Sequence, residues 1–565
     1  ADGLNQPLDR EIQVEPAAVS PPPAAEEFDL MGDLDEPTDG SVVPGPLVTV
    51  RGWSVLDPVA YIEVTVDGEA SFARQMALPR PDVALHLASP HAGFCGFEHV
   101  VDLTDRSSGA HVHITVEGVD ADGSHQLIGT STVTVGPAED RPADPVDDGY
   151  LAVLRARTDA VTSRHRPATD GIRLLVVTHD LGLGGGQLYL QELLLRLLDQ
   201  PDLRALVVSP TDGPLRPELE ARGVEVHLAG HPPTEPAANE SYLRGLAYLA
   251  AEFATTAVLA NTTGAAGGVT LAERLGVPAL WAIHESYAPE HFLLAAHGPG
   301  GAHPAAAERL DGALSSAAAV IFEADGTREL YCSHGDARRF VTIDYGIAVG
   351  TVDEFQATDD RDARRRALGW GPDDVVLLCV GTLEPRKAQA SLLRAFARVA
   401  PDHPEAVLVL VGDRGDPYGD EVRAYAGRLG LDDRVRVEPV TPDCYAWYAA
   451  ADAFVLNSDV ESLPRSALEA MAFGLPAIVA DVFGLGELVD DGVTGFHVTP
   501  RDLASLEGGL RRLLRLDGPE RRAMGARAAA HIGAEHDSHG YATAYRRLLD
   551  GLAADPTAFP GAILD

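Results

Sequence analysis

The sequence predicts an α/β protein in which two Rossmann-like domains follow a small antiparallel β-sandwich and an acidic N-terminal tail. Three observations support this fold class. From about residue 171, short apolar runs alternate with helical segments, the order that gives a parallel, doubly wound sheet. This series occurs twice, once before and once after about residue 350. The stretch 46–137 instead alternates apolar and polar residues with a period of two, as half-buried antiparallel strands do.

The composition is that of a globular protein with an unusual charge. Hydrophobic residues make up 45% of the 565 residues and charged residues 23%, which is ordinary for a chain with a buried core. The length allows three or four domains of about 100–200 residues each. The net charge of −41 is extreme. Because like charges repel, it argues against non-specific binding to nucleic acid or to an anionic membrane, and a polyanionic ligand needs a local positive pocket.

Cysteine spacing and hydropathy bear on the compartment. The four cysteines lie far apart and form no C-x-x-C pair, which argues against a zinc site and a disulfide framework and fits a reducing environment. The sequence has no run of about 18 apolar residues, and its first residues lack the charged-then-apolar pattern of a signal peptide. We therefore expect a cytoplasmic protein, either free or peripheral at the membrane, with no transmembrane segment.

Three segments are predicted before the Rossmann-like domains. Residues 1–45 are rich in proline and acidic residues, and such a segment buries too little apolar surface to offset its ordering entropy, so we predict a disordered tail. Residues 46–137 have the pattern of a β-sandwich. Residues 138–170 are predicted as a linker with a helix at 149–161. The clearest strands of the sandwich are expected at 47–53, 61–67, 111–118 and 130–135.

The two Rossmann-like domains are predicted at 171–350 and 351–535. Two such domains in tandem imply a cleft where the carboxyl ends of both sheets face one ligand. The strands expected in the first are 173–178, 205–208, 224–228, 257–260, 279–283 and 319–322. Those expected in the second are 374–380, 406–411, 435–437, 453–456 and 477–479. Helices are expected at 519–531 and 539–552.

A glycine-rich turn follows the first strand of the first domain, in the run Leu181-Gly-Leu-Gly-Gly-Gly-Gln187. It departs from a dinucleotide fingerprint, because Gln187 stands where that motif has glycine or alanine. The second strand also ends at Ser209-Pro210, without the acidic residue that would bind a ribose hydroxyl. A nicotinamide or flavin enzyme is therefore disfavoured. The three glycines at 184–186 still allow the backbone to approach a ligand closely, and a plain tight turn is the alternative.

The corresponding turn of the second domain contains the only lysine of the chain, Lys387, in the run Gly381-Thr-Leu-Glu-Pro-Arg-Lys387. A flexible stem with a compact charge suits contact with a phosphate at a strand-to-helix turn. The alternative is that a composition-biased genome left one lysine there by chance. A basic pair at the start of a helix opposes the helix dipole, which favours a bound anion over chance.

Later in the second domain, two glutamates, Glu461 and Glu469, are separated by seven residues. Pro464 between them suits the first turn of a helix, which puts Glu461 in the loop and Glu469 inside the helix. The first N–H groups of such a helix lack intrahelical partners and can face an anion.

With these motifs, residues 171–550 resemble a retaining glycosyltransferase of family 4, which has the GT-B fold of two Rossmann-like domains facing a cleft. The likeness rests on the glycine-rich first loop, a histidine after a strand of the N-terminal domain (His284), the basic pair Arg386-Lys387 and the E-x7-E spacing of Glu461 and Glu469. The segment 485–495 matches the closing segment of the family. The preceding sandwich resembles accessory modules joined to such enzymes.

The resemblance implies transfer of a hexose from a nucleotide-diphosphate sugar to a glycan, lipid or small-molecule acceptor. It implies retention of anomeric configuration and no metal or other cofactor. The N-terminal domain would bind the acceptor, the C-terminal domain the donor, and the helix within 536–565 would cross back to the N-terminal domain. The catalytic residues implied are His284, Glu461, Lys387 and Arg386. The donor-binding residues implied are Gly184, Gly185, Gly186, Gly381, Thr382, Arg386, Lys387, Glu461, Ser462, Leu463, Pro464 and Glu469.

The chemistry of these residue types agrees with the roles that the resemblance implies. Lys387 and Arg386 would neutralise the diphosphate and stabilise it as a leaving group. Glu469 would accept hydrogen bonds from the ribose hydroxyls. Glu461 would hold hydroxyls of the sugar beside the phosphate, with His284 on the other side of the sugar.

The sequence departs from the family pattern at three places. Ala388 stands where a glycine usually follows the lysine, and Thr382 where many members have an arginine. The loop after Glu461 reads Ser-Leu-Pro in place of a glycine-containing sequence.

Each residue also has an ordinary explanation. Glu469 could lie on a solvated helix face, and His284 could be a hydrogen-bonded structural histidine. Two other functions are compatible with these features: another GT-B chemistry such as sugar-nucleotide epimerisation, and non-catalytic sugar binding or scaffolding.

Overall fold

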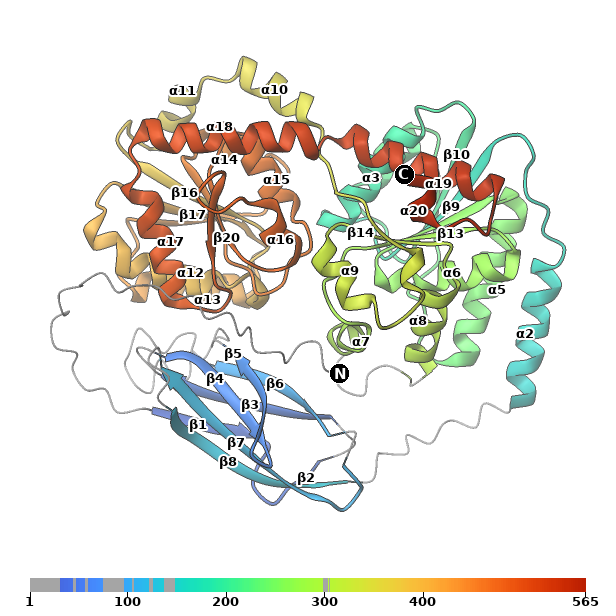
Figure 1. Ribbon diagram of the computed structural model, residues 1–565, viewed down its shortest axis with the longest axis horizontal. Coiled ribbons are helices and arrows are strands. Elements are labelled where there is room, and N and C mark those ends of the chain that lie inside the picture. The colour runs from blue at the N-terminus through green and yellow to red at the C-terminus, as the bar shows by residue number, and fades with distance from the viewer. Residues whose placement is uncertain are drawn as a thin grey trace. The chain divides into compact units, whose positions relative to one another are not determined.

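The structure is a computed structural model with an N-terminal sandwich and two α/β sheets (Figure 1). It describes residues 31–43, 47–55, 59–74, 96–103, 106–120, 125–136, 148–297, 303 and 305–564. The described residues fall into two compact units. One comprises the chain up to 142 with 381–440 and 498–512, and the other comprises 143–380, 441–497 and 513–565.

The sandwich consists of a three-stranded sheet of order β1-β3-β6 and a five-stranded sheet of order β2-β8-β7-β4-β5. Neighbouring strands are antiparallel, except that β2 pairs with β8 in parallel. The strands are β1 (Met31–Glu36), β2 (Val42–Val43), β3 (Leu47–Val55), β4 (Val59–Val66), β5 (Glu69–Arg74), β6 (Gly96–Asp102), β7 (His111–Asp120) and β8 (His125–Val135).

The period-two pattern explains the core of the sandwich. In β3, β4, β7 and β8 alternate residues point inward, and the apolar ones, such as Val50, Val64, Ile114 and Val133, are fully buried in one cluster. The four strands predicted from this pattern are all present, as β3, β4, β7 and β8.

Residues 31–36 and 42–43, predicted as part of the tail, belong to the sandwich as β1 and β2. In β1, Leu34 lies opposite Gly52 of β3 and packs against the sandwich core. The acidic composition of this segment hides its strand character, because β1 is held by pairing with a strand elsewhere in the chain. Residues 1–30, the remainder of the predicted tail, lie outside the described residues, as do 80–83 and Cys95.

The first Rossmann-like half contains a seven-stranded parallel sheet of order β11-β10-β9-β12-β13-β14-β15. Its strands are β9 (Ile172–Thr178), β10 (Leu203–Ser209), β11 (Glu225–Leu228), β12 (Ala257–Asn261), β13 (Ala279–Ile283), β14 (Ala319–Phe322) and β15 (Phe340–Thr342). The helices are α2 (Asp148–Thr162), α3 (Gly185–Leu197), α4 (Arg216–Ala221), α5 (Pro236–Phe253), α6 (Ala266–Leu275), α7 (Pro289–His297), α8 (Ala305–Ser316) and α9 (Asp325–Tyr331).

Continuous apolar runs bury the central strands of this sheet on both faces, as is typical of parallel strands. Every residue of β12, β13 and β14 is buried, and Trp281 of β13 lies in the centre of the core with its indole N–H donating to the carbonyl of Thr262. The six strands predicted for this domain are all found, and the short edge strand β15 is additional.

The second Rossmann-like half has a six-stranded sheet of order β18-β17-β16-β19-β20-β21. Its strands are β16 (Val375–Val380), β17 (Ala406–Asp413), β18 (Val435–Pro439), β19 (Ala453–Leu456), β20 (Ala477–Ala480) and β21 (Gly495–Val498). Its helices are α10 (Val349–Thr358), α11 (Arg361–Ala367), α12 (Gln389–Val399), α13 (Pro417–Arg428), α14 (Tyr445–Ala450), α15 (Arg465–Ala472), α16 (Phe483–Leu488), α17 (Leu503–Arg515) and α18 (Gly518–Glu535). Short 3-10 turns lie at η2 (Thr263–Ala265), η3 (Ala337–Arg339), η4 (Pro385–Lys387) and η5 (Ala400–Asp402).

The last helices, α19 (Ser538–Ala554) and α20 (Pro560–Leu564), return to the first Rossmann-like half. The hydroxyl of Tyr541 in α19 donates to the carbonyl of Tyr189 in α3 at 3.3 Å, and Arg546 pairs with Asp202 at 2.7 Å. The helix predicted at 539–552 corresponds to α19, and these contacts join it to α3 and to Asp202. None of the described helices combines the length and the apolar character that crossing a bilayer takes.

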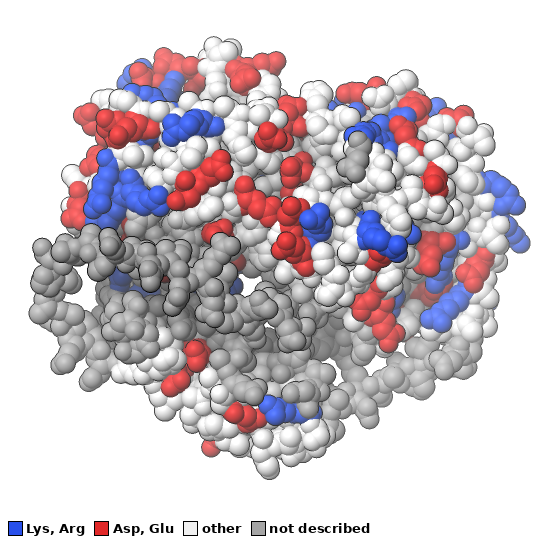
Figure 2. Space-filling view, viewed as in Figure 1, with Lys and Arg blue, Asp and Glu red and all other residues white. Residues whose placement is uncertain are grey.

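Acidic and basic side chains lie side by side over the face shown in Figure 2. Many described arginines have a carboxylate partner, such as Arg216 with Glu220 at 2.7 Å and Arg222 with Asp199 at 2.7 Å. Such exposed pairs add little to stability.

Candidate functional site

The glycine-rich turn connects β9 to α3, and the close contacts of its backbone explain two of its glycines. A Cβ atom on Gly184 would lie 2.3 Å from Oε1 of Gln187, and one on Gly186 would lie 3.2 Å from Cδ2 of His284. Gly185, between them, has open space where a Cβ would be. The structure thus brings two of the predicted site residues, Gly186 and His284, into contact.

Gln187 holds this turn in shape. Its side-chain amide donates to Oδ1 of Asp180 at 2.7 Å and lies 2.9 Å from Nε2 of His179. The same Asp180 oxygen accepts the backbone N–H of Gly182 at 2.6 Å. The residue that excluded a dinucleotide fingerprint therefore has a structural role in the turn.

His284 follows β13 and is enclosed by side chains from the two neighbouring strands. Its Nδ1 lies 2.8 Å from Oε1 of Glu323, which follows β14, and its Nε2 lies 2.8 Å from Oδ1 of Asn261, the last residue of β12. The amide nitrogen of Asn261 donates to the carbonyl of Gly186 at 3.0 Å. This bond leaves the amide oxygen facing His284, so both ring nitrogens act as donors.

These contacts indicate a protonated His284. Burial opposes its charge, but the carboxylates of Glu323 and Glu285 outweigh burial and raise the pKa of His284 above its ordinary value. The ring also meets Tyr189 edge-on, with centroids 4.5 Å apart. His284 is thus held at both ring nitrogens and along one edge, in surroundings that favour its charged form.

The basic pair lies in η4, after β16. Lys387 is only 8% exposed, and a Cβ on Gly381 would lie 3.7 Å from Cε of Lys387, so its stem passes over that glycine. Arg386 is half-exposed and pairs with Glu384 at 2.7 Å. The carbonyl of Thr382 accepts the side-chain amide of Gln389 at 2.9 Å. The structure therefore groups Gly381, Thr382, Arg386 and Lys387 around one turn.

Ala388 shows why a glycine is usual after the lysine. It has φ +53° and ψ +32°, in the left-handed region that a residue with a Cβ adopts only at a cost. The turn therefore has this left-handed conformation with alanine in place of the usual glycine. The alanine strains the backbone and does not change the shape of the turn.

The E-x7-E segment connects β19 to α15. Glu461 lies in the loop and is 8% exposed, while Ser462 and Leu463 beside it are also buried. Pro464 is the residue before the helix rather than in its first turn, and the helix begins at Arg465. The hydroxyl of Ser462 lies 3.4 Å from that of Thr327 in α9.

Glu469 lies inside α15 and is 7% exposed, which excludes a solvated helix face. Its Oε1 accepts a hydrogen bond from Nε of Arg465 at 2.7 Å. Burial raises the pKa of Glu469 above its ordinary value, while Arg465 and the hydroxyl of Tyr448 act in the opposite direction. Burial of a charged carboxylate is costly unless the carboxylate is paired with a cation or binds a ligand.

Sequence reasoning missed Asn261, Glu323 and Arg465. Asn261 and Glu323 stand at the carboxyl ends of the strands beside β13. The strand order of a doubly wound sheet could have pointed to both. Arg465 lies between the two predicted glutamates, but two of its partners, Glu192 and Tyr345, are distant in the sequence.

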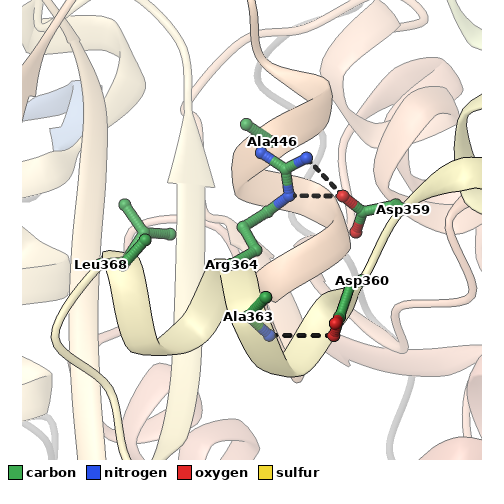
Figure 3. Close-up of a pocket in the computed structure, with 7 residues that line it drawn as sticks. Asp359, Asp360, Ala363, Arg364, Leu368 and Ala446 are labelled. Atoms are coloured by element: carbon green, nitrogen blue, oxygen red, sulfur yellow. Dashed lines mark hydrogen bonds and ion pairs between the residues drawn. The ribbon is translucent and has the colours of Figure 1, made fainter.

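The described residues also contain two features apart from these. One group of three potential metal ligands, Glu63, Glu117 and His125, lies on the five-stranded sheet of the sandwich. A pocket of about 430 Å³ lies beside α11 and α14, and in it the side chain of Arg364 points across to Asp359 (Figure 3). The pocket contains none of the residues predicted for donor binding.

Comparison with protein families gives two matches. The family described as "Glycosyl transferases group 1" matches residues 360–531, and the "Glycosyl transferase 4-like domain" matches residues 184–346. These ranges contain every residue predicted for the site, on both Rossmann-like halves.

The curated relatives include two D-inositol 3-phosphate glycosyltransferases. The D-inositol 3-phosphate glycosyltransferase of Geodermatophilus obscurus is 36% identical over 264 residues, which cover 43% of this chain and 56% of the relative. The D-inositol 3-phosphate glycosyltransferase 2 of Catenulispora acidiphila is 35% identical over 303 residues, which cover 50% of this chain and 68% of the relative. The chain thus spans between about half and two thirds of the length of these relatives.

Solved structures share the fold. Anabaena HepE in complex with UDP-glucose has a TM-score of 0.57 at 24% identity, covering 68% of this chain and all of HepE. WaaG, a glycosyltransferase of lipopolysaccharide biosynthesis, has a TM-score of 0.54 at 18% identity, covering 67% of this chain and all of WaaG. At these identities the likeness shows the GT-B fold alone.

Proposed function

Because this chain belongs to the group 1 glycosyl transferases, we propose that it transfers a hexose from a nucleoside-diphosphate sugar to a hydroxyl of an acceptor, with retention of anomeric configuration and without a metal ion. The observation that carries the proposal is the burial of three charged residues in the family's motif positions. Lys387, Glu461 and Glu469 are each 8% exposed or less. Burying a charge costs several kcal/mol per ion unless it is paired or bound, so three buried charges at the positions of the family's motifs favour a binding role.

The proposed donor contacts follow from the chemistry of these groups. Lys387 and Arg386 stabilise the negative charge that develops on the departing diphosphate, the part a metal ion has in other enzymes. Glu469 accepts hydrogen bonds from the ribose hydroxyls, and Glu461 from hydroxyls of the hexose. The protonated His284 beside Gly186 adds positive charge and fixes the glycine-rich turn.

Retention follows if the acceptor attacks the face from which the diphosphate leaves. The acceptor oxygen bonds to the anomeric carbon, the bond from that carbon to the phosphate oxygen breaks, and the hydroxyl proton passes to the departing phosphate oxygen. No proton acceptor from the protein is needed in this step.

The relatives indicate which substrates to try first. HepE was solved with UDP-glucose, and the curated relatives act on D-inositol 3-phosphate according to their names. We therefore propose a UDP-hexose as donor and a polyol or its phosphate ester as acceptor. A sugar-nucleotide epimerase and a non-catalytic sugar-binding protein are the two alternatives.

The experiment combines the protein with UDP-, GDP- and ADP-hexoses, with and without inositol and inositol phosphate. Release of nucleoside diphosphate together with an acceptor heavier by one hexose supports the proposal, and the anomeric coupling constant in the NMR spectrum of the product reports retention. Unchanged rates in a chelator support metal independence. Epimerised sugar with no transfer would favour the first alternative, and neither turnover nor thermal stabilisation by any donor would favour the second.

A further inference from the structure

Arg465 is the first residue of α15 and lies one helical turn before Glu469. Its Nε donates to Oε1 of Glu469 at 2.7 Å, a spacing of four residues that places both side chains on one face of the helix. One oxygen of the predicted ribose-binding carboxylate is therefore occupied by an arginine of the same helix.

The other end of the same guanidinium contacts the first Rossmann-like half. Nη1 of Arg465 lies 2.8 Å from Oε1 of Glu192 and donates to the hydroxyl of Tyr345 at 2.6 Å. The Tyr345 hydroxyl in turn donates to Oε2 of Glu192 at 3.0 Å. The planar guanidinium thus joins two carboxylates in a fixed geometry, which a lysine ammonium would not reproduce.

Glu192 belongs to α3, the helix that begins at the glycine-rich turn. At its first residues, α3 is tied to His284 through Asn261, and one turn further Tyr189 donates its hydroxyl to Tyr545 at 2.9 Å. The link from Arg465 to Glu192 therefore ends on an element that is otherwise fixed to the glycine-rich turn.

The three charged groups are largely out of water: counted over the side chain alone, the exposed fraction is 17% for Arg465, 20% for Glu192 and 10% for Glu469. Burial works against the charge of Arg465, but Tyr345, Glu469 and Glu192 hold its pKa well above the ordinary value. In such a group, removal of one partner leaves an uncompensated charge, and a buried carboxylate responds by taking up a proton.

We propose that Arg465 is a positioning residue for donor binding, which keeps Glu469 ionised and oriented and joins the helix that carries it to the helix that follows the glycine-rich turn. This inference rests on the proposed function, because it assumes that Glu469 accepts hydrogen bonds from the donor. A protonated Glu469 would lose part of that capacity. The link to Glu192 makes order in α15 and order in α3 depend on each other.

The first experiment measures kcat and donor KM of Arg465→Gln between pH 6 and 9. Arg465 is the group that most lowers the pKa of Glu469, so without it this pKa rises further, and the protonated fraction of the carboxyl group is larger at low pH than at high pH. We expect the donor KM of Arg465→Gln to exceed that of the parent by about tenfold at the low end of this pH range and by less as the pH increases, with a smaller change in kcat. A KM that is raised equally at all pH values, or not raised, would overturn the proposal.

Arg274→Gln is the matched control. Arg274 makes a two-pronged pair with Glu240, a glutamate as buried as Glu469, at 2.5 and 3.0 Å, but both lie on helices of the first half away from the motifs. The Arg274→Gln substitution also removes the arginine of a buried arginine–glutamate pair. It should therefore lower the melting temperature without adding a pH dependence to the donor KM. The same pH dependence in Arg274→Gln would show that the effect in Arg465→Gln is general destabilisation.

The second experiment uses Glu192→Gln, which keeps the Arg465–Glu469 pair and does not depend on the folding of Arg465→Gln. Hydrogen exchange is followed with and without uridine diphosphate. In the parent, we expect the ligand to slow exchange in both α15 and α3. In Glu192→Gln the protection of α15 should remain and that of α3 beyond its first turn should be lost, and full protection of that part of α3 would overturn the proposed link. A parent that neither binds nor turns over any donor would instead contradict the proposed function.

Discussion

At the residue scale, Lys387 gives the most direct test of the donor site. It is the only lysine of the chain and is 8% exposed. If its ammonium stabilises the leaving diphosphate, Lys387→Ala removes an interaction that strengthens in the transition state, and kcat should fall about 100-fold. Steady-state kinetics with the best donor would measure this, and the melting temperature would report an intact fold.

Arg386→Ala is the comparison for that variant. Arg386 is half-exposed and shares its charge with Glu384, so the loss of kcat should be smaller than for Lys387→Ala. An unchanged kcat in Lys387→Ala, with the fold intact, would show that Lys387 does not act in the donor site.

His284 and Glu323 predict a pH-dependent contribution to stability. The folded pKa of His284 is raised above the unfolded value of 6.5, with burial opposing and Glu323 favouring the charge. Such a group contributes stability that is fully present below the unfolded pKa and is lost as the pH rises through the folded pKa. The melting temperature of the parent should therefore exceed that of Glu323→Gln most at low pH.

Differential scanning calorimetry of both proteins between pH 5.5 and 9 would measure this difference. The difference in melting temperature between the parent and Glu323→Gln should become smaller as the pH increases through and above the unfolded pKa of the histidine. A difference that stays constant over the range would mean that His284 is neutral in the folded protein.

The sequence shows which residue types could form a donor site but not which of them are held by partners. The motif positions of Lys387, Glu461 and Glu469 could be read directly, because they sit at fixed distances from predicted strands. The pairing of Arg465 with Glu192 could not, because these residues are far apart in the chain and meet only through the packing of two domains. The functional roles themselves stay predictions.

At the element scale, the turn from β16 to α12 contains a strained residue that can be relieved. Ala388 has a left-handed backbone, which costs a residue with a Cβ about 1–2 kcal/mol. Ala388→Gly should therefore raise the free energy of unfolding by about 0.5 kcal/mol, after the greater freedom of glycine in the unfolded chain is deducted.

Calorimetry that compares Ala388→Gly with Ala395→Gly would test the sign of the change in the free energy of unfolding. Ala395 lies inside α12 and is fully buried, so glycine there should destabilise by about 1 kcal/mol. Destabilisation by both substitutions would mean that the backbone at 388 is not left-handed in solution.

Elements with continuous apolar runs were the most predictable. β12 was predicted at 257–260 and ends at Asn261, because buried parallel strands are marked by their own residues. β1 was not predicted, because its acidic sequence carries little strand signal and its pairing partner β3 supplies the stabilisation. Local pattern therefore identifies central strands and misses an edge strand that depends on tertiary context.

At the scale of the whole molecule, the net charge of −41 should act on substrate capture. A nucleotide sugar is an anion and meets a repulsive long-range field before it reaches the local cations. Raising the ionic strength from about 20 to 200 mM shortens the Debye length and should increase kcat/KM for the donor about two- to threefold. The KM of an uncharged acceptor, measured alongside, should not change, and a fall in donor kcat/KM would mean that local attraction dominates.

The burial of a single lysine has one more consequence. An endoproteinase that cuts only after lysine has one target bond in this chain, between Lys387 and Ala388, in a turn that must open before it fits a protease. Digestion under native conditions should be slow and yield two fragments, and a bound donor should slow it further. Gel densitometry of the two fragments would then report how often the turn opens. Rapid cleavage that no donor slows would contradict both the burial of Lys387 in this turn and the contact of the turn with the donor.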